Sequence, residues 1–246
     1  KPEDWTRITR VNRVSFRIGA TVLIGHNGNA IQSYGFKKKR ILGNLQKVLK
    51  FLDAYKVDEI HAIVPFKGKG DSGSSRIFSH LSELSISTPL GIGGGITERN
   101  IEEITKDPFF ERCIFNSAIF NNPELLQKTK SIMGHQSMVA SIPFIIDDNL
   151  KIYHSKTNSF QAIKDELWEE IGSNFNEVLL LDANAEGTKK GFNFQVFKYI
   201  KFPIDRILIS GGLTKCDINK ARKMGLAGVS IDNFALHSEY SIEALR

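Results

Sequence analysis

The sequence predicts an α/β fold, a single (βα)8 TIM barrel that spans residues 1–246. Apolar runs of strand length alternate with segments of helical period, about eight of each. The strand runs are apolar throughout, which is typical of strands buried on both faces of a parallel sheet. No Pro-, Ser- or Gly-rich linker divides the 246 residues, and this length is ordinary for one such barrel.

The expected strands and helices follow one another along the whole chain. Leu45, Val48, Leu49 and Leu52 recur at helical spacing in one expected helix, and Pro123 opens another with Asn122 as its N-cap. The expected strands are 20–25, 59–65, 89–94, 111–118, 137–146, 177–183, 205–212 and 228–233, with a further β-like segment at 151–155. The expected helices are 42–56, 75–84, 98–107, 122–134, 161–173, a short one near 194–201, 217–225 and a closing helix.

Composition and motif spacing exclude several functional classes. The net charge of +6 is modest, and the basic run FKKKRIL (36–42) has no nucleic-acid motif beside it, so we interpret it as a solvated loop or one facing an anionic substrate or a partner. There is no apolar stretch long enough for a membrane span and no apolar centre of a signal peptide. Cys113 and Cys216 form no CxxC, which favours a reducing cytoplasm without disulfides. The histidines lack metal-binding spacing, so we expect neither a metal nor a cofactor.

A glycine cluster, GIGGGIT at 91–97, raises the first functional question. A dinucleotide-binding fingerprint would need its third glycine at Ile96, so that interpretation fails on spacing. Two interpretations remain. The turn could present backbone N–H groups to an anion at a helix start, or it could be a tight turn that binds nothing.

An internal repeat favours the anion. GGGIT returns as SGGLT at 210–214, and Ile96 aligns with Leu213 at an offset of 117 residues (213 − 96 = 117). At the same offset the turn beginning at Asn116 aligns with the one beginning at Asn233. The chain therefore reads as two related half-barrels. In such a barrel these turns lie on opposite sides of one mouth at the carboxyl ends of the strands, which suits a ligand with a phosphate at each end.

These motifs carry a resemblance to a known family. The paired glycine and Asn turns, DANAEGTKKGFN (182–193), ASI (140–142) and NSAIFNNPELL (116–126) resemble the histidine-biosynthetic half-barrel family, above all the cyclase subunit of imidazole glycerol phosphate synthase. The resemblance implies a bisphosphate substrate, a phosphorylated small molecule at the C-terminal face of the barrel. Carried over by residue, it implies phosphate contacts at Gly95, Asn116, Ser117, Glu186, Gly187, Gly211, Gly212 and Asn233.

The chain departs from the family pattern where the cyclase needs its acid and base. The two expected aspartates fall on Leu23 or Ile24 and on Pro143. Apolar groups cannot exchange protons, so the ring-closing reaction should be absent. Asp182 and Glu186 are the remaining, weaker candidates for a catalytic role.

The resemblance also implies a charged gate at the opposite, N-terminal mouth. In the family two basic and two acidic side chains guard a passage for ammonia, and Arg17, Glu59, Arg112 and Glu177 occupy these positions. Each opens an expected strand, so the four should point inward as one layer. The alternative is a structural salt-bridge ring that closes the barrel floor.

Three functional hypotheses follow. The first is a barrel subunit that receives ammonia from a separate glutaminase docked at the N-terminal face and delivers it to another acceptor. The sequence is more similar to paralogues associated with surface-polysaccharide gene sets, which implies a sugar as that acceptor. The second is a cyclase or isomerase with relocated catalytic groups, and the third is a sensor of a phosphorylated ligand.

Overall fold

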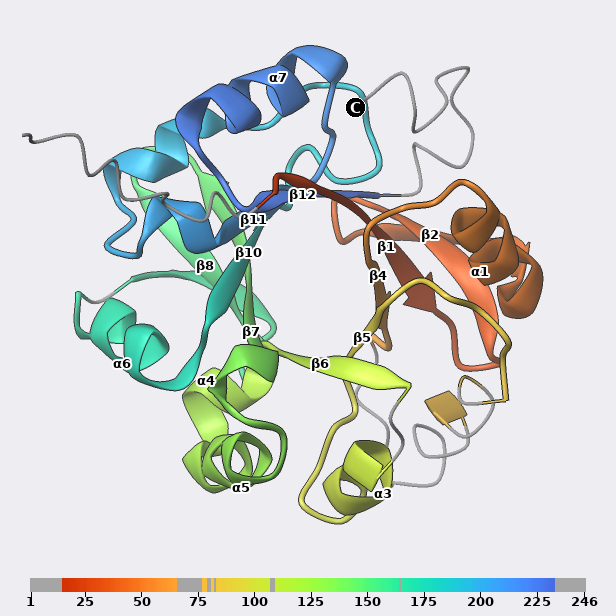
Figure 1. Ribbon diagram of the computed structural model, residues 1–246. Coiled ribbons are helices and arrows are strands. Elements are labelled where there is room, and N and C mark those ends of the chain that lie inside the picture. The colour runs from red at the N-terminus through yellow and green to blue at the C-terminus, as the bar shows by residue number, and fades with distance from the viewer. Residues whose placement is uncertain are drawn as a thin grey trace, which may run out of the picture.

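The computed structural model describes residues 15–65, 77–78, 81, 83–106, 109–163 and 165–232. Parallel strands close into a barrel with helices around it, as Figure 1 shows, and this confirms the predicted (βα)8 fold. The barrel strands, in spatial order, are β1 (Arg17–Ile24), β4 (Ile60–Ile63), β5 (Leu90–Gly93), β6 (Phe110–Phe115), β7 (Met138–Ile146), β10 (Glu177–Asp182), β11 (Ile207–Ser210) and β12 (Gly228–Ile231). Strand β12 pairs with β1 in parallel, Arg17 opposite Gly228, and so closes the barrel.

Short polar side chains define where the outer helices begin. Asn44 accepts a hydrogen bond from the Lys47 amide, and Asn122 accepts one from the Leu125 amide, as an N-cap should. The helices are α1 (Leu45–Ala54), α3 (Ile101–Lys106), α4 (Ser117–Asn121), α5 (Pro123–Met133), α6 (Glu166–Asn174) and α7 (Lys215–Met224), with 310 helices at His135–Ser137, Phe194–Lys198 and Ile204–Arg206. The expected closing helix and half of the residues 75–84 lie outside the described residues.

Each half of the barrel adds an antiparallel pair of strands after its first barrel strand. Strands β2 (Asn29–Tyr34) and β3 (Lys38–Asn44) follow β1, while β8 (Leu150–His154) and β9 (Ser159–Ala162) follow β7. The basic run at 36–42, expected to be a loop, is therefore mostly strand, and the helix expected to start at residue 161 starts at Glu166 instead. Strand β3 pairs only with β2, and such an edge strand tolerates its exposed Lys39 and Arg40 because charge there discourages pairing with another chain.

The repeat found in the sequence recurs in the backbone. Gly95 and Gly212, 117 residues apart, both adopt positive φ, 67° and 65°. The next turn is also repeated: the Thr97 amide donates to Asn100 Oδ1 over 2.8 Å, and the Thr214 amide donates to Asp217 Oδ2 over 2.9 Å. The two halves therefore use the same strand-to-helix turn, and both turns lie at the same end of the barrel.

Two apolar clusters hold the barrel together. The larger lies between strands and helices and includes Ile24, Phe144 and Trp168. The smaller one fills the barrel interior and consists of Ile114, Val139, Leu179, Leu208 and Ala227, with Ile63 packed against it. Side chains therefore fill the middle of the barrel, as is usual for this fold.

Candidate functional site

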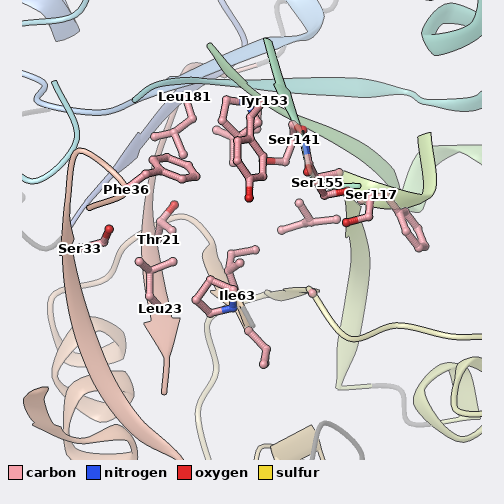
Figure 2. A pocket seen from close by; sticks show the side chains of 18 of the residues that line it. Thr21, Leu23, Ser33, Phe36, Ile63, Ser117, Ser141, Tyr153, Ser155 and Leu181 are labelled. Atoms are coloured by element: carbon pink, nitrogen blue, oxygen red, sulfur yellow. Dashed lines mark hydrogen bonds between the residues drawn. The ribbon is translucent and has the colours of Figure 1, made fainter. Parts of the chain in front are cut away.

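A cavity of about 790 Å3 lies where the barrel strands end at their carboxyl termini. Its walls are largely apolar, with Leu23, Ile63 and Leu181 among them. Figure 2 shows Thr21, Leu23 and Ser33 on one side of this space and Ser117 on the other. A concave, apolar site with a few polar groups is the usual form of a small-molecule site.

The two positions where the resemblance would place the cyclase acid and base are occupied by apolar residues. Leu23 lines the cavity, whereas the alternative, Ile24, is fully buried in the outer core. Pro143 lines the cavity as well. Among the described lining residues, the carboxylates are those of Glu186 and Asp232. Acid–base chemistry by a carboxyl group in this cavity therefore falls to these two, and Lys39 and Tyr153 line the cavity as well.

Glu186 is a buried carboxyl that faces the cavity. Its Oε2 accepts hydrogen bonds from Ser33 Oγ over 3.0 Å and from the Phe36 amide over 2.8 Å. Burial raises the pKa of Glu186 above its usual value, against the effect of these hydrogen bonds and of the nearby Lys39 charge. A carboxyl with a raised pKa can serve as an acid near neutral pH.

Asp182 has a different environment. Its Oδ1 accepts from the amides of Asn184 and Ala185, and its Oδ2 accepts from the Asn193 amide over 2.9 Å. Burial raises the pKa of Asp182, but both oxygens are engaged by backbone and the residue does not line the cavity. This geometry makes Asp182 the anchor of the loop that carries Glu186 and Gly187.

The residues of the first half that are expected to bind phosphate all line the cavity. They are Gly95, Asn116 and Ser117. Asn116 is held in place because its Nδ2 donates to the Ser141 carbonyl over 3.0 Å, and the Gly95 carbonyl accepts from Asn100 Nδ2 over 2.8 Å. Neither bond uses the backbone amide of Gly95, Asn116 or Ser117.

The residues of the second half that are expected to bind phosphate are arranged differently. The amides of Gly187 and Gly212 both donate to Asp232 Oδ2, over 2.9 Å and 3.2 Å. Gly211, directly before Gly212, has a φ of 99°, and an added Cβ there would lie 2.5 Å from the Asp182 carbonyl oxygen, so only glycine fits. Asn233 lies outside the described residues.

A closed ring of charges occupies the opposite end of the barrel. Arg17 Nη2 and Arg112 Nη1 donate to the two oxygens of Glu177, over 2.7 Å and 2.6 Å. On the other side Arg17 Nε and Arg112 Nε approach Glu59 only to 3.6 Å and 3.5 Å. The structure thus brings together all four residues expected there, tightly at Glu177 and loosely at Glu59.

Polar groups lead from this ring through the barrel interior. His61 Nε2 lies 3.6 Å from Glu59 Oε1, and His61 Nδ1 lies 3.0 Å from Ser230 Oγ. Ser230 Oγ in turn lies 2.7 Å from Thr21 Oγ1, and Thr21 lines the cavity. A connected row of polar side chains, which we call the His61–Ser230–Thr21 row, therefore joins the floor ring to the cavity.

Motif spacing does not single out several of these residues. The expected phosphate contacts include Asn233 and not its neighbour Asp232, and His61 is not among the expected site residues. The available signal was the period of two along the strands, which places Glu59, His61 and Ile63 on one inward face. The same alternation directs Ser230 and Asp232 inward from the last barrel strand.

Two findings bear on other ligands and environments. In the described part of the chain, His, Cys, Asp and Glu side chains nowhere gather in threes that could hold a metal ion. None of the described helices combines the length and apolarity that crossing a bilayer would require.

Comparison with known proteins shows to which family the chain is related. Residues 19–240 match the family described as "Histidine biosynthesis protein". The "Putative imidazole glycerol phosphate synthase subunit hisF2" of Campylobacter jejuni is 26% identical over 231 residues, 88% of this chain and 90% of that protein. The putative subunit of the same synthase from Leptospira interrogans is 22% identical over 227 residues, 87% of each chain. A phosphoribosyl imidazole-4-carboxamide isomerase from Pectobacterium atrosepticum is 28% identical over 166 residues, 64% of this chain and 67% of the isomerase.

The match covers nearly all of the barrel, and the repeated glycine turns lie within it. The chain therefore belongs to the histidine biosynthesis protein family.

Proposed function

We propose that this chain is the barrel subunit of a glutamine-dependent amidotransferase. A separate glutaminase docks at the N-terminal face and releases ammonia below the ring of Arg17, Glu59, Arg112 and Glu177. The ammonia passes the ring, crosses the barrel interior and leaves through the cavity toward an acceptor. The relatives named as putative subunits of imidazole glycerol phosphate synthase support a partner of this kind.

The observation that carries the proposal is the His61–Ser230–Thr21 row. Ammonia both donates and accepts hydrogen bonds, so a row of imidazole and hydroxyl groups offers it successive partners across an otherwise apolar interior. The row begins within 3.6 Å of Glu59 and ends at Thr21 in the cavity wall. A barrel that served only as a rigid scaffold would gain more from apolar side chains at these buried positions.

The loose side of the ring indicates where ammonia would pass. Glu177 holds both guanidinium groups by short hydrogen bonds, while their contacts to Glu59 exceed 3.4 Å. His61 adjoins Glu59, on this loose side. Small shifts of the two arginines away from Glu59 would therefore open the ring next to the start of the row.

We propose further that the cavity binds a phosphorylated small molecule through the turn amides at Gly95 and Ser117. We propose that the acceptor of ammonia is a sugar in surface-polysaccharide synthesis and that another enzyme transfers the ammonia to it. Leu23 and Pro143 line this cavity in place of proton-transferring groups, which is why the acceptor reaction is assigned elsewhere.

The test uses glutamine labelled with 15N at its amide, hydrolysed by a glutaminase of the synthase type in complex with this chain. Replacing the row by apolar groups, as in Ser230→Ala and His61→Leu, should slow glutamine turnover or shift release of label to the glutaminase side. Ser131→Ala is the matched control, since that hydroxyl is on the surface and bonds only the Lys128 carbonyl. A complex whose turnover and label release are the same in all three variants would rule out the route.

A second candidate is a cyclase or isomerase that uses Glu186 and Asp232 as its acid and base. The observation in its favour is that these two carboxylates line the cavity and that burial raises the pKa of Glu186. The purified chain would then convert the phosphoribosyl imidazole intermediates, and Glu186→Gln would reduce turnover by about 10²–10⁴-fold. We expect no turnover by the unmodified chain.

A further inference from the structure

The two repeat-related turns differ in one respect that decides what they can bind. In the first half, the amides of Gly95 and Ile96 donate to no acceptor among the described residues. In the second half, the matching amide of Gly212 donates to Asp232, and so does the amide of Gly187. The anion that these second-half amides would attract is already present as a carboxylate of the chain itself.

The difference comes from a single position of the repeat. Phe115 stands where the second half has Asp232 (232 − 115 = 117). Phe115 packs against the core, 6.3 Å from the Phe175 ring, and also lines the cavity, but it has no oxygen that could accept from the amides of the first turn. Asp232 is 9% exposed and is held across the second turn.

The surroundings of Asp232 also disfavour a second phosphate. Glu186 lines the same part of the cavity, and the charge of Asp232 raises the pKa of Glu186, so the two carboxyls lie close enough to repel each other. The positive charge of Lys39 acts on Glu186 and partly offsets the negative charge of the two carboxyls. A phosphate dianion placed here would meet two acidic groups and one basic group, and it would have to displace Asp232 from both amides.

The same end of the cavity presents a buried hydroxyl that a ligand could bind. Ser210 lines the cavity and is 1% exposed, and its Oγ has no hydrogen-bond partner among the described residues. A buried polar atom without a partner costs free energy that a bound ligand can recover. The oxygens of Asp232 and Glu186 next to it are acceptors, so they match the donors of a ligand.

We propose that the cavity takes a ligand with one phosphate group rather than two. The phosphate lies at the first-half turn, against the amides of Gly95 and Ser117, and the opposite end of the ligand presents hydroxyl or amino groups to Asp232, Glu186 and Ser210. The proposal rests on the phosphorylated ligand of the proposed function and narrows it to phosphomonoesters of polyols, sugars or amino sugars.

The experiment compares two probes with one carbon skeleton, ribulose 5-phosphate and ribulose 1,5-bisphosphate. Affinity is measured by calorimetry at fixed ionic strength. The pH is kept well above the second pKa of a phosphate monoester, which is about 6, so that each phosphate is a dianion. The unmodified chain should bind the monophosphate at least about tenfold more tightly than the bisphosphate, a difference of roughly 1.4 kcal/mol. Asp232→Ser frees the amides of Gly187 and Gly212, and it should reverse the preference.

Asp232→Asn provides the matched variant. Its side-chain oxygen still accepts from the two amides while the charge is gone, so its preference should lie between those of the unmodified chain and Asp232→Ser. If Asp232→Ser fails to fold, the unmodified chain and Asp232→Asn decide the matter by themselves.

Three results would overturn the proposal: tighter binding of the bisphosphate by the unmodified chain, the same preference in all variants, or no binding of either probe. Transport of ammonia is measured separately with labelled glutamine. An intact 15N route with either of the first two results would therefore refute the one-phosphate ligand and leave the amidotransferase assignment in place.

Discussion

Glu177 is the residue through which the floor ring can be tested most directly. Its two oxygens accept from Arg17 over 2.7 Å and from Arg112 over 2.6 Å, and its side chain is 9% exposed. In Glu177→Gln one of these oxygens becomes an NH2 group that faces a guanidinium donor, so one charge-assisted hydrogen bond is lost. Such a bond contributes about 1.5–3 kcal/mol.

The arginine side chains retain 15% and 22% exposure, and water reaching them softens the loss. We therefore expect Glu177→Gln to lower the free energy of unfolding by about 2 kcal/mol, which for a domain of this size lowers Tm by roughly 4–8 °C. A domain typically has about 5–15 kcal/mol of stability, so the variant should still fold.

The assay pairs thermal unfolding with the 15N experiment on the same preparation. If the ring gates ammonia, Glu177→Gln should also leak label from the glutaminase face, because Arg17 and Arg112 are no longer both held in place. Glu102→Gln is the matched control, since Glu102 pairs with Lys128 on the surface, and it should change neither Tm nor label release. A loss of about 3–5 kcal/mol with label release unchanged would refute the gate and identify a purely structural ring.

Three further predictions concern stability and reactivity. Burial opposes ionisation of Glu59, yet the neighbouring imidazole and guanidinium groups lower its pKa from 4.5 to about 2. Ionised Glu59 therefore adds about 3 kcal/mol to the free energy of unfolding above pH 4.5, and this contribution is lost as the pH falls toward 2. The free energy of unfolding of Glu59→Gln, measured in urea, should accordingly fall less steeply between pH 4.5 and pH 2 than that of the unmodified chain. Burial raises the pKa of the Cys113 thiol to about 12, whereas Cys216 is exposed, so a thiol reagent should titrate one cysteine in the native chain and two in urea; two fast thiols would contradict this. Phe144 is fully buried, so Phe144→Ala should cost about 3–5 kcal/mol, against less than about 0.5 kcal/mol for the half-exposed Phe51→Ala, and equal losses would contradict the packing described.

The barrel could be predicted from the sequence because its signals are local. A buried parallel strand such as Val178–Leu181 is apolar at every position, and a helix start such as Asn122–Pro123 is marked by its own side chains. The repeated glycine turns were equally visible, since positive φ at Gly95 and Gly212 restricts the choice of residue.

The antiparallel strands could not be predicted in the same way. Strand β3 carries Lys39 and Arg40 on an exposed edge, where the stabilising partner is the neighbouring strand and not a buried face. Arg40 Nε donates to Gln32 Oε1 on β2 over 2.7 Å, a contact that no spacing in the sequence announces.

The repeat placed the two turns at one end of the barrel, but it could not show which groups lie against them. Both turns were expected to bind an anion, but whether a turn is free or filled depends on one inward-facing residue of another strand. Asp232 meets Gly187 across 45 residues of sequence, and that distance is bridged only when the barrel closes.

The aromatic rings above the cavity have a consequence for the rates of ligand exchange. Phe36 precedes β3, whereas Tyr153 and Phe160 belong to β8 and β9, and the three ring centroids lie 5.5–6.3 Å apart. Figure 2 shows Phe36 and Tyr153 side by side at the cavity. The antiparallel strands of the two halves therefore meet over the mouth, and widening it on this side separates ring pairs worth about 0.5–1.5 kcal/mol each. Breaking two such pairs slows opening by roughly 5- to 160-fold, so the residence time of a bound molecule is set partly by side chains that belong to neither turn.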